Sequence, residues 1–271
     1  MKRYFSATGA DAAPPLSGPG YIYRQLRRVG LSDIAARTVQ PRLRPHSYET
    51  GTPVWKRGGS IDGWTLVVSG MVGKSIDAGK GNAASLGIYG QGVWFGEQAI
   101  LSGRPSMADY ICLVDTDLLT LPKTVVEALL KTDQAFGEHM AKLVSRRLVT
   151  SSEALALHKT GTSCAKVIIG LAQLAGELTS ELEEQRADRA FVPIPQGSLA
   201  SICGVSRTVF SNFVLQLERQ GWIELSYGGV EFLRLANWLK LLDAQQANVR
   251  INAMGSIEQI LGAVPSGGAL A

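Results

Sequence analysis

The sequence predicts an α+β protein with two folded parts, an antiparallel β-roll and a small helical domain with a β-hairpin, joined by a long helix. Three observations support this fold class. Short apolar runs separated by glycines fill residues 52–121, and the apolar period changes from two to 3.6 near Thr132. Two short helical patterns around Gly204 then precede two strand-like runs. A chain of 271 residues is long enough for two separate cores.

These patterns divide the chain into five segments. We expect a flexible N-terminal extension over 1–20, a β-roll domain over 21–131, a long helix over 132–161, a winged helix-turn-helix domain over 162–243 and a tail over 244–271. The extension is expected because Pro14-Pro15 and Gly18-Pro19-Gly20 are typical of irregular chain. The last residues are rich in glycine and alanine, and we predict no function for them.

A short helix around Leu31–Val39 is expected before the β-roll. The strands of the roll are then predicted at 52–55, 64–68, 71–72, 86–89, 93–95, 110–114 and 118–121, with a polar turn at Gly79-Lys80-Gly81-Asn82. Pro122 ends the strands at a position where a helix can begin.

The long helix carries an apolar stripe at spacings of three and four. Its members are Phe136, Met140, Leu143, Val144, Leu148, Ser151 and Leu155. The chain between the two domains offers little material to cover this stripe, and an uncovered apolar seam favours pairing with a second copy. We therefore predict a parallel dimer helix. A second helix, around Lys166–Leu174, opens the C-terminal domain.

Residues 196–217 form a helix-turn-helix pattern. Ser198 is a plausible cap of the first helix, Gly204 provides the turn, and Ser206 caps the second helix. The second helix has an apolar face, formed by Phe210, Phe213, Val214 and Leu217. Its opposite face is polar, as a helix that enters the major groove requires. A hairpin with a Gly228-Gly229 turn follows and predicts a wing.

Two motifs together resemble the Crp/Fnr family of transcriptional regulators. The first motif resembles the phosphate cassette of cyclic-nucleotide-type sensor domains. It consists of Gly92-Val93-Trp94-Phe95-Gly96-Glu97 and runs on to Arg104-Pro105-Ser106-Met107-Ala108. The second motif is the helix-turn-helix, which follows it in the chain. The resemblance covers roughly residues 30–243. It implies a homodimeric, sequence-specific DNA-binding regulator of the bacterial type, with double-stranded DNA, a second copy and RNA polymerase as partners. It implies no enzymatic activity.

The resemblance also implies candidate effector contacts. They are Gly96, Glu97, Ser106, Met107, Ser151 and Ser152. The family places an arginine after the cassette proline, where this chain has Ser106, and Arg104 stands on the other side of Pro105. Loss of a charge-assisted contact to phosphate makes cyclic AMP an unlikely effector. Four alternatives stay open: a degenerate pocket with another effector or none, altered nucleotide binding, haem sensing through His46, His139 or His158, and redox sensing through Cys112 or Cys203.

The DNA-reading motif of the family resembles Ser-Arg-Glu-Thr-Val-Ser-Arg. Here it is Ser206-Arg207-Thr208-Val209-Phe210-Ser211-Asn212, so Thr208 replaces the glutamate and Asn212 the second arginine. Asparagine pairs with adenine and arginine with guanine. We expect a half-site that differs from the TGTGA type. The candidate DNA contacts are Ser198, Ser206, Arg207, Thr208, Ser211, Asn212 and Gln216.

Charge, cysteine content and the lack of other motifs limit the other functional classes that the protein could belong to. Residues 21–60 contain eight Lys or Arg against two acids, whereas residues 186–250 contain seven against five, so the net charge of +4 permits DNA binding without identifying it. Cys112, Cys164 and Cys203 form no metal or disulfide pattern, and we expect no metal. The chain shows no signal peptide or membrane span, which predicts a cytoplasmic protein. A hydrolase or transferase lacks support from any catalytic motif, and a nucleotide-binding interaction module without DNA binding is a further alternative.

Overall fold

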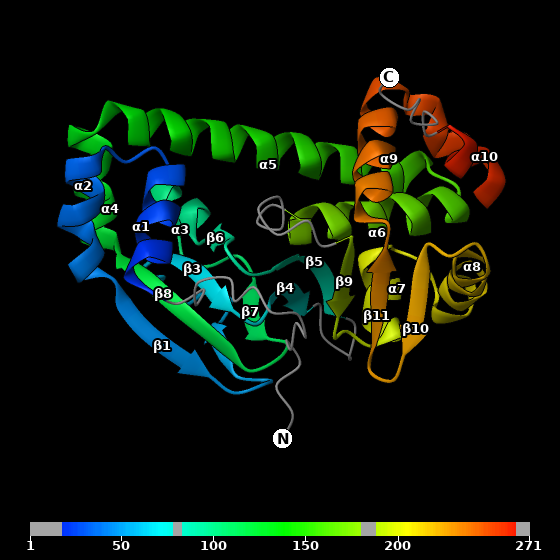
Figure 1. Ribbon diagram of the computed structural model, residues 1–271, viewed down its shortest axis with the longest axis horizontal. Helices are drawn as coiled ribbons and strands as arrows, with labels where there is room; N and C mark the ends of the chain where they lie inside the picture. Colours follow the sequence, from blue (N-terminus) through cyan, green and yellow to red (C-terminus); the bar gives the residue numbers. More distant parts are fainter. Residues whose placement is uncertain (1–17, 78–82, 180–187, 264–271) are drawn as a thin grey trace, which may run out of the picture.

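The computed structural model describes residues 18–77, 83–179 and 188–263. Its N-terminal half is a β-roll made of two four-stranded antiparallel sheets, with strand orders β1-β8-β3-β6 and β2-β7-β4-β5 (Figure 1). The strands are β1 (Arg44–Tyr48), β2 (Pro53–Trp55), β3 (Gly63–Ser69), β4 (Val72–Asp77), β5 (Ala83–Tyr89), β6 (Trp94–Phe95), β7 (Asp109–Cys112) and β8 (Thr116–Pro122). The predicted α+β fold with a β-roll is confirmed. The predicted turn at Gly79–Asn82 lies outside the described residues, although β4 and β5 pair antiparallel on either side of it.

Strand β1 was not predicted, because its residues lack an alternating apolar pattern. It pairs with β8 at the edge of its sheet, from Arg44 opposite Thr120 to Tyr48 opposite Thr116. An edge strand tolerates Pro45, which has no N–H to donate. Its side chains are mostly exposed or half-buried, so the sequence gives little periodic signal there.

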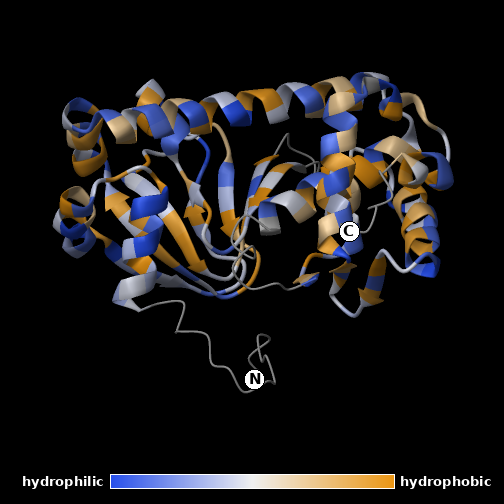
Figure 2. Cartoon of the chain, turned by 45° about the horizontal axis from the view of Figure 1, so that its top comes forward, coloured by the Kyte–Doolittle hydropathy of each residue, from blue (hydrophilic) through white to orange (hydrophobic). Residues whose placement is uncertain are grey.

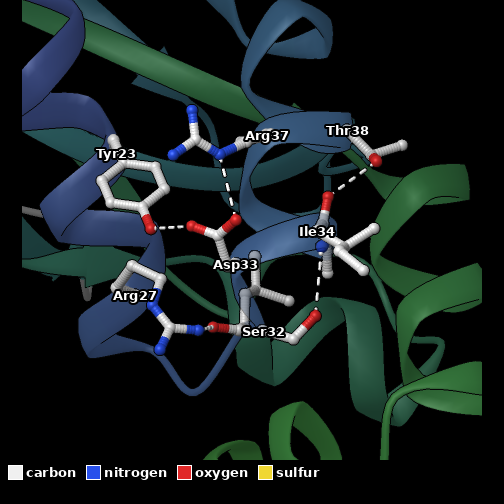
Figure 3. Close-up of polar contacts among 9 residues, drawn as sticks. Tyr23, Arg27, Ser32, Asp33, Ile34, Arg37 and Thr38 are labelled. Carbon is white, nitrogen blue, oxygen red and sulfur yellow. Dashed lines mark hydrogen bonds and ion pairs between the residues drawn. The ribbon is translucent and has the colours of Figure 1, made fainter.

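Two helices cover one end of the β-roll. Helix α1 (Pro19–Arg28) begins with proline at its first turn, so Pro19 and Gly20 are helical rather than part of the extension expected over 1–20. Helix α2 (Asp33–Val39) is capped by Ser32, which accepts from the Ala35 N–H at 3.1 Å, and the turn η1 (Gln40–Arg42) follows. Figure 3 shows how Asp33 ties the two helices together: it accepts hydrogen bonds from the Tyr23 hydroxyl and, at 3.0 Å, from Arg37 Nε.

Helix α3 (Glu97–Ser102) belongs to the sensor cassette, and α4 (Lys123–Thr132) begins directly after Pro122, as predicted. Asp133 then caps α5 (Gln134–Thr160) through the Phe136 N–H at 3.0 Å. The 27-residue α5 runs along one side of the molecule from the β-roll to the C-terminal domain (Figure 1). In Figure 2 the ribbon of α5 alternates between hydrophobic and hydrophilic colours along its length.

The C-terminal domain starts with α6 (Ser163–Thr179) and β9 (Arg189–Val192). It continues with α7 (Gln196–Ile202), α8 (Arg207–Arg219), β10 (Ile223–Ser226), β11 (Gly229–Leu233), α9 (Leu235–Ala247), η3 (Val249–Ala253) and α10 (Ile257–Gly262). Residues 244–263, grouped above with the tail, are therefore structured. Ile251, Ile257 and Ile260 are fully buried in the core of this domain, which explains why α10 packs here.

The two domains share a hydrophobic contact at strand β5. Met71 and Ile88 of the β-roll belong to the same buried cluster as α6, Leu199 and Ala200. Helices α6 and α7 both contact β5, whose opposite face carries Tyr89 toward the interior of the roll. Within the described residues no single helix is both long and apolar enough to cross a membrane. Helices α7 and α8 meet the length and composition only when they are counted together, and they are bent by 100° relative to each other.

Candidate nucleic-acid interface and sensor site

Helix α8 is amphipathic in the way the sequence predicts. Phe210, Val214 and Leu217 are fully buried against the rest of the domain. Ser206 caps the helix and accepts from the Val209 N–H at 3.3 Å. The first turn of α8 is thereby held in position, with its polar side chains on the outside and its N-terminal end free.

The candidate DNA contacts lie together on the outer surface of the helix-turn-helix. Ser198, Ser206, Arg207, Thr208, Asn212 and Gln216 are exposed, and Ser211 is half-buried. In the free chain the Gln216 amide donates to the Asn212 carbonyl at 3.2 Å. The predicted capping role of Ser198 is wrong, because α7 begins at Gln196 after Pro195, which leaves Ser198 inside the helix.

The wing differs from its prediction in one detail. Ser226 pairs with Gly229, so the turn residues are Tyr227 and Gly228 instead of the two glycines. Gly228 has a φ of +83°, which glycine adopts without strain. The Tyr227 side chain is fully exposed at the tip, and β9 adds a third strand that the sequence pattern did not indicate.

The sensor cassette turns at Gly96, where glycine is required for two reasons. Its φ is +102°, and a Cβ at this position would lie 2.9 Å from the Trp55 ring and 3.0 Å from the Gly63 carbonyl oxygen. The turn starts α3, and its first residue, Glu97, is only 2% exposed. Gly96 thus directs a carboxylate into the interior of the β-roll.

The Glu97 carboxylate is paired with Arg147 of α5. One guanidinium nitrogen of Arg147 contacts Glu97 Oε1, and the other donates to the Trp94 carbonyl at 2.6 Å. The same guanidinium lies 5.4 Å from the centre of the Tyr89 ring. Burial opposes the charged form of Arg147, but the attraction of Glu97 keeps its pKa above the ordinary value. The long helix is therefore fastened to the cassette.

Aromatic rings and a second cation complete the interior of the site. Tyr89, Phe95 and Tyr110 stack on one another with centroids 5.1 to 6.0 Å apart. Lys74 of β4 is 8% exposed, and its ammonium donates to Gln98 Oε1 at 2.9 Å. Burial lowers the pKa of Lys74, against the attraction of Glu97. Burial likewise raises the pKa of Tyr110 to about 12, and Glu97 adds to that rise.

The structure brings only part of the predicted effector set together. Gly96 and Glu97 face the interior, and the buried Ser106 hydroxyl donates to the Ala108 carbonyl at 2.7 Å. Met107 is 54% exposed. Ser151 and Ser152 are also exposed; Ser151 follows Arg147 by one turn on the same side of α5, whereas Ser152 lies on another side.

The other candidate ligands stay apart. Arg104 is exposed, after the left-handed Gly103, and does not reach the buried cluster. His46 lies on β1, whereas His139 and His158 lie toward opposite ends of α5. The three histidines therefore do not form a common haem pocket.

Arg147 and Lys74 are the site residues that the sequence reasoning missed. The signal for Arg147 was available, because it continues the face of Phe136, Met140 and Leu143 at a spacing of four. Phe136 and Met140 are fully buried, so a basic residue on this face predicts a buried partner. Lys74 gives no such signal, because its burial depends on contacts between separate strands.

Comparisons with known proteins agree with this geometry. Residues 45–133 match the family model of the cyclic nucleotide-binding domain. The cyclic AMP receptor protein of Thermus thermophilus is 27% identical over 199 residues, covering 73% of this chain and 86% of that protein. A lysophospholipase of Coccidioides immitis matches over 41% of the chain but 8% of its own length, at 26% identity.

Solved structures show the same fold over about three quarters of the chain. FixK2 from Bradyrhizobium japonicum superposes with a TM-score of 0.61 at 16% identity, over 72% of this chain and 96% of its own. The c-di-GMP responsive regulator CLP of Xanthomonas campestris gives 0.57 at 16% identity, over 74% and 99%. A CRP/FNR-family transcriptional regulator from Thermus thermophilus gives 0.55 at 22% identity, over 74% and 98%.

The fold and the site together define a class of protein in which a domain that matches the cyclic nucleotide-binding family is joined by a long helix to a winged helix-turn-helix domain. The chain is similar to proteins of the Crp/Fnr type, the family that its two sequence motifs predict.

Proposed function

We propose that the protein is a homodimeric transcriptional regulator that binds double-stranded DNA through α8, and that it is not an enzyme. The observation that carries the proposal is the exposed polar ridge from Arg207 to Gln216, supported from behind by fully buried Phe210, Val214 and Leu217. A rigid helix with a polar outer face at the end of a domain suits the major groove. The similar structures from Xanthomonas campestris and Thermus thermophilus are of regulators, which supports the same role.

The dimer is supported by the C-terminal half of α5. The predicted apolar stripe divides, because a strict repeat drifts around a straight helix. Its first members, Phe136 and Met140, are buried in the β-roll core. Leu148 and Leu155 are 66% and 57% exposed. Two such helices placed side by side would cover these leucines and direct both α8 helices to the same side of a duplex.

Base reading follows from the side chains at the N-terminal half of α8. Asn212 suits adenine, Arg207 suits guanine or a phosphate, and Thr208 suits a thymine methyl group. Residue Ser106, in place of the family arginine, argues against cyclic AMP as effector. A regulator of this kind would also contact RNA polymerase.

A gel shift and footprint test the proposal, with the full chain on a duplex carrying its own promoter. We expect a protected region with two-fold symmetry, and a solution mass of twice the chain mass by light scattering. A monomer without affinity for any duplex would contradict the proposal and favour an interaction module without DNA binding.

A further inference from the structure

Two cations, the buried Lys74 and the half-buried Arg147, converge on one buried carboxylate in the β-roll. Lys74 reaches this point from β4 and Arg147 from α5, while Glu97 is the shared negative group. Glu97 pairs directly with Arg147. Among the residues that the structure describes, no carboxylate oxygen lies within 4.0 Å of the Lys74 ammonium. The cluster formed by Lys74, Arg147 and Glu97 therefore carries an excess of one positive charge.

The surroundings of Lys74 do not neutralise it. Its polar partner is the amide oxygen of Gln98 at 2.9 Å, and the Tyr110 ring centre lies 5.9 Å away. A neutral amide and an aromatic face stabilise an ammonium far less than a carboxylate does. The second carboxylate that acts on Arg147, Glu177 of α6, forms no ion pair with either cation in the described part of the chain.

A buried ammonium without a counter-ion is costly, and a methionine would fill the same space without that cost. Charged groups held in such surroundings are candidates for ligand binding. The ligand would have to be negative, because it must balance the excess charge. One oxygen of Glu97, Oε2, is also buried without a hydrogen-bond partner, so the polar groups of the cluster are incompletely satisfied.

The position of Gln98 suggests how an anion would reach Lys74. Gln98 follows Glu97 on α3, and its side chain is exposed to solvent. The Lys74 ammonium therefore lies directly beneath a surface side chain that can rotate aside. An oxyanion that displaced the Gln98 amide would replace a neutral acceptor by a charged one.

We propose that Lys74 and Arg147 form the anion-binding part of the sensor site, and that the effector is a small organic oxyanion. Lys74 would supply, from β4, the positive charge that the cassette lacks at Ser106. The regulatory part of this inference rests on the proposed function, since the bound anion would alter DNA binding through α5. The binding part stands independently, because it concerns the cluster alone.

Thermal unfolding of the full chain tests the site with inorganic phosphate and acetate as probes, at constant ionic strength in chloride. Phosphate is expected to raise Tm in a saturable manner, by about 5 °C at 100 times its Kd. Acetate distinguishes a carboxylate site from a phosphate site. Lys74→Met should lose the response to both anions, while Lys74→Arg should keep it. Without added anion, Lys74→Met should unfold at the same temperature as the wild type or higher.

The matched control is Lys240→Met, which removes an exposed lysine of α9 far from the cluster and should respond like the wild type. Equal responses of the wild type and Lys74→Met, or no response of the wild type to either anion, would overturn the proposal. Gel shifts of the same proteins form a separate arm. A wild type that responds to phosphate but binds no duplex supports the anion site and contradicts the proposed regulator.

Discussion

The imidazole of His158, near the end of α5, lies against Gly204 in the turn between α7 and α8. A Cβ built on Gly204 would stand 2.2 Å from two atoms of the His158 ring. The long helix therefore contacts the helix-turn-helix at a residue that has no side chain. Since Arg147 of α5 also forms an ion pair with Glu97, this helix contacts both the sensor cassette and the winged helix-turn-helix domain.

Substitution of Gly204 should be unusually harmful. Gly204→Ala meets a φ of +65° and the His158 ring, and we expect a loss of about 3 kcal/mol in the free energy of unfolding. Gly228→Ala is the control, because its φ is +83° but nothing lies within 4 Å; its cost should be about 1–2 kcal/mol. Urea unfolding measures both. His158→Ala should restore part of the stability of Gly204→Ala, and a failure to do so would contradict the contact.

The exposed leucines of α5 should decide the oligomeric state. Leu148→Lys is expected to weaken the dimer by about 30-fold or more, since it places a charge at the centre of the apolar face. Sedimentation at several concentrations measures the dissociation constant. Thr150→Lys adds the same charge on the opposite, exposed face and should leave the constant unchanged. If both variants dimerise like the wild type, another surface forms the dimer.

Glu97 and Arg147 should be coupled in stability. Glu97→Gln leaves the half-buried Arg147 guanidinium without its partner, and Arg147→Met leaves the buried Glu97 carboxylate without its ion pair, so each variant should lose about 3 kcal/mol of stability. The double variant should lose clearly less than the sum of the two. A double-mutant cycle measured by denaturant unfolding gives the coupling energy between the two side chains. If the two losses simply add in the double variant, the ion pair contributes nothing to stability.

Much of the fold could be predicted because its signals are local. Period, glycine position and capping are visible in α2, α8 and the start of α4, and the structure places these helices there. Helix α1 was missed because Ser17-Gly18-Pro19-Gly20 is also typical of irregular chain. Helix α10 was not predicted because the sequence around it is rich in glycine and alanine, although Ile257 and Ile260 are buried.

The interior of the sensor site could be predicted only in part. Phe95-Gly96-Glu97 is a contiguous motif, so its turn is visible in sequence. The partners of Glu97 come from β4 and α5, and their approach depends on how the strands and the long helix pack. Ser151 and Ser152 were expected at the same site, but both are exposed: Ser152 lies on another side of α5 from Arg147, and Ser151 lies one turn beyond Arg147 on an exposed part of the helix.

Helix α10, near the end of the described residues, supports a stability prediction. Ile260→Ala should cost about 2–5 kcal/mol, because Ile260 is completely buried in the C-terminal core. The exposed Gln246→Ala on α9 should change stability by less than about 0.5 kcal/mol. Thermal unfolding compares the two variants. Equal stability of both would show that α10 does not belong to the folded domain.

Selection of binding sites from a random duplex pool tests the central claim most directly. The account predicts enrichment of an inverted repeat whose half-sites lie one DNA turn apart and differ from the TGTGA type. Asn212→Ala should relax the preference for adenine at one position of each half-site, with a loss of about 1–3 kcal/mol in the free energy that discriminates adenine from other bases. A pool without any enriched symmetric sequence would contradict a paired molecule that reads DNA through α8.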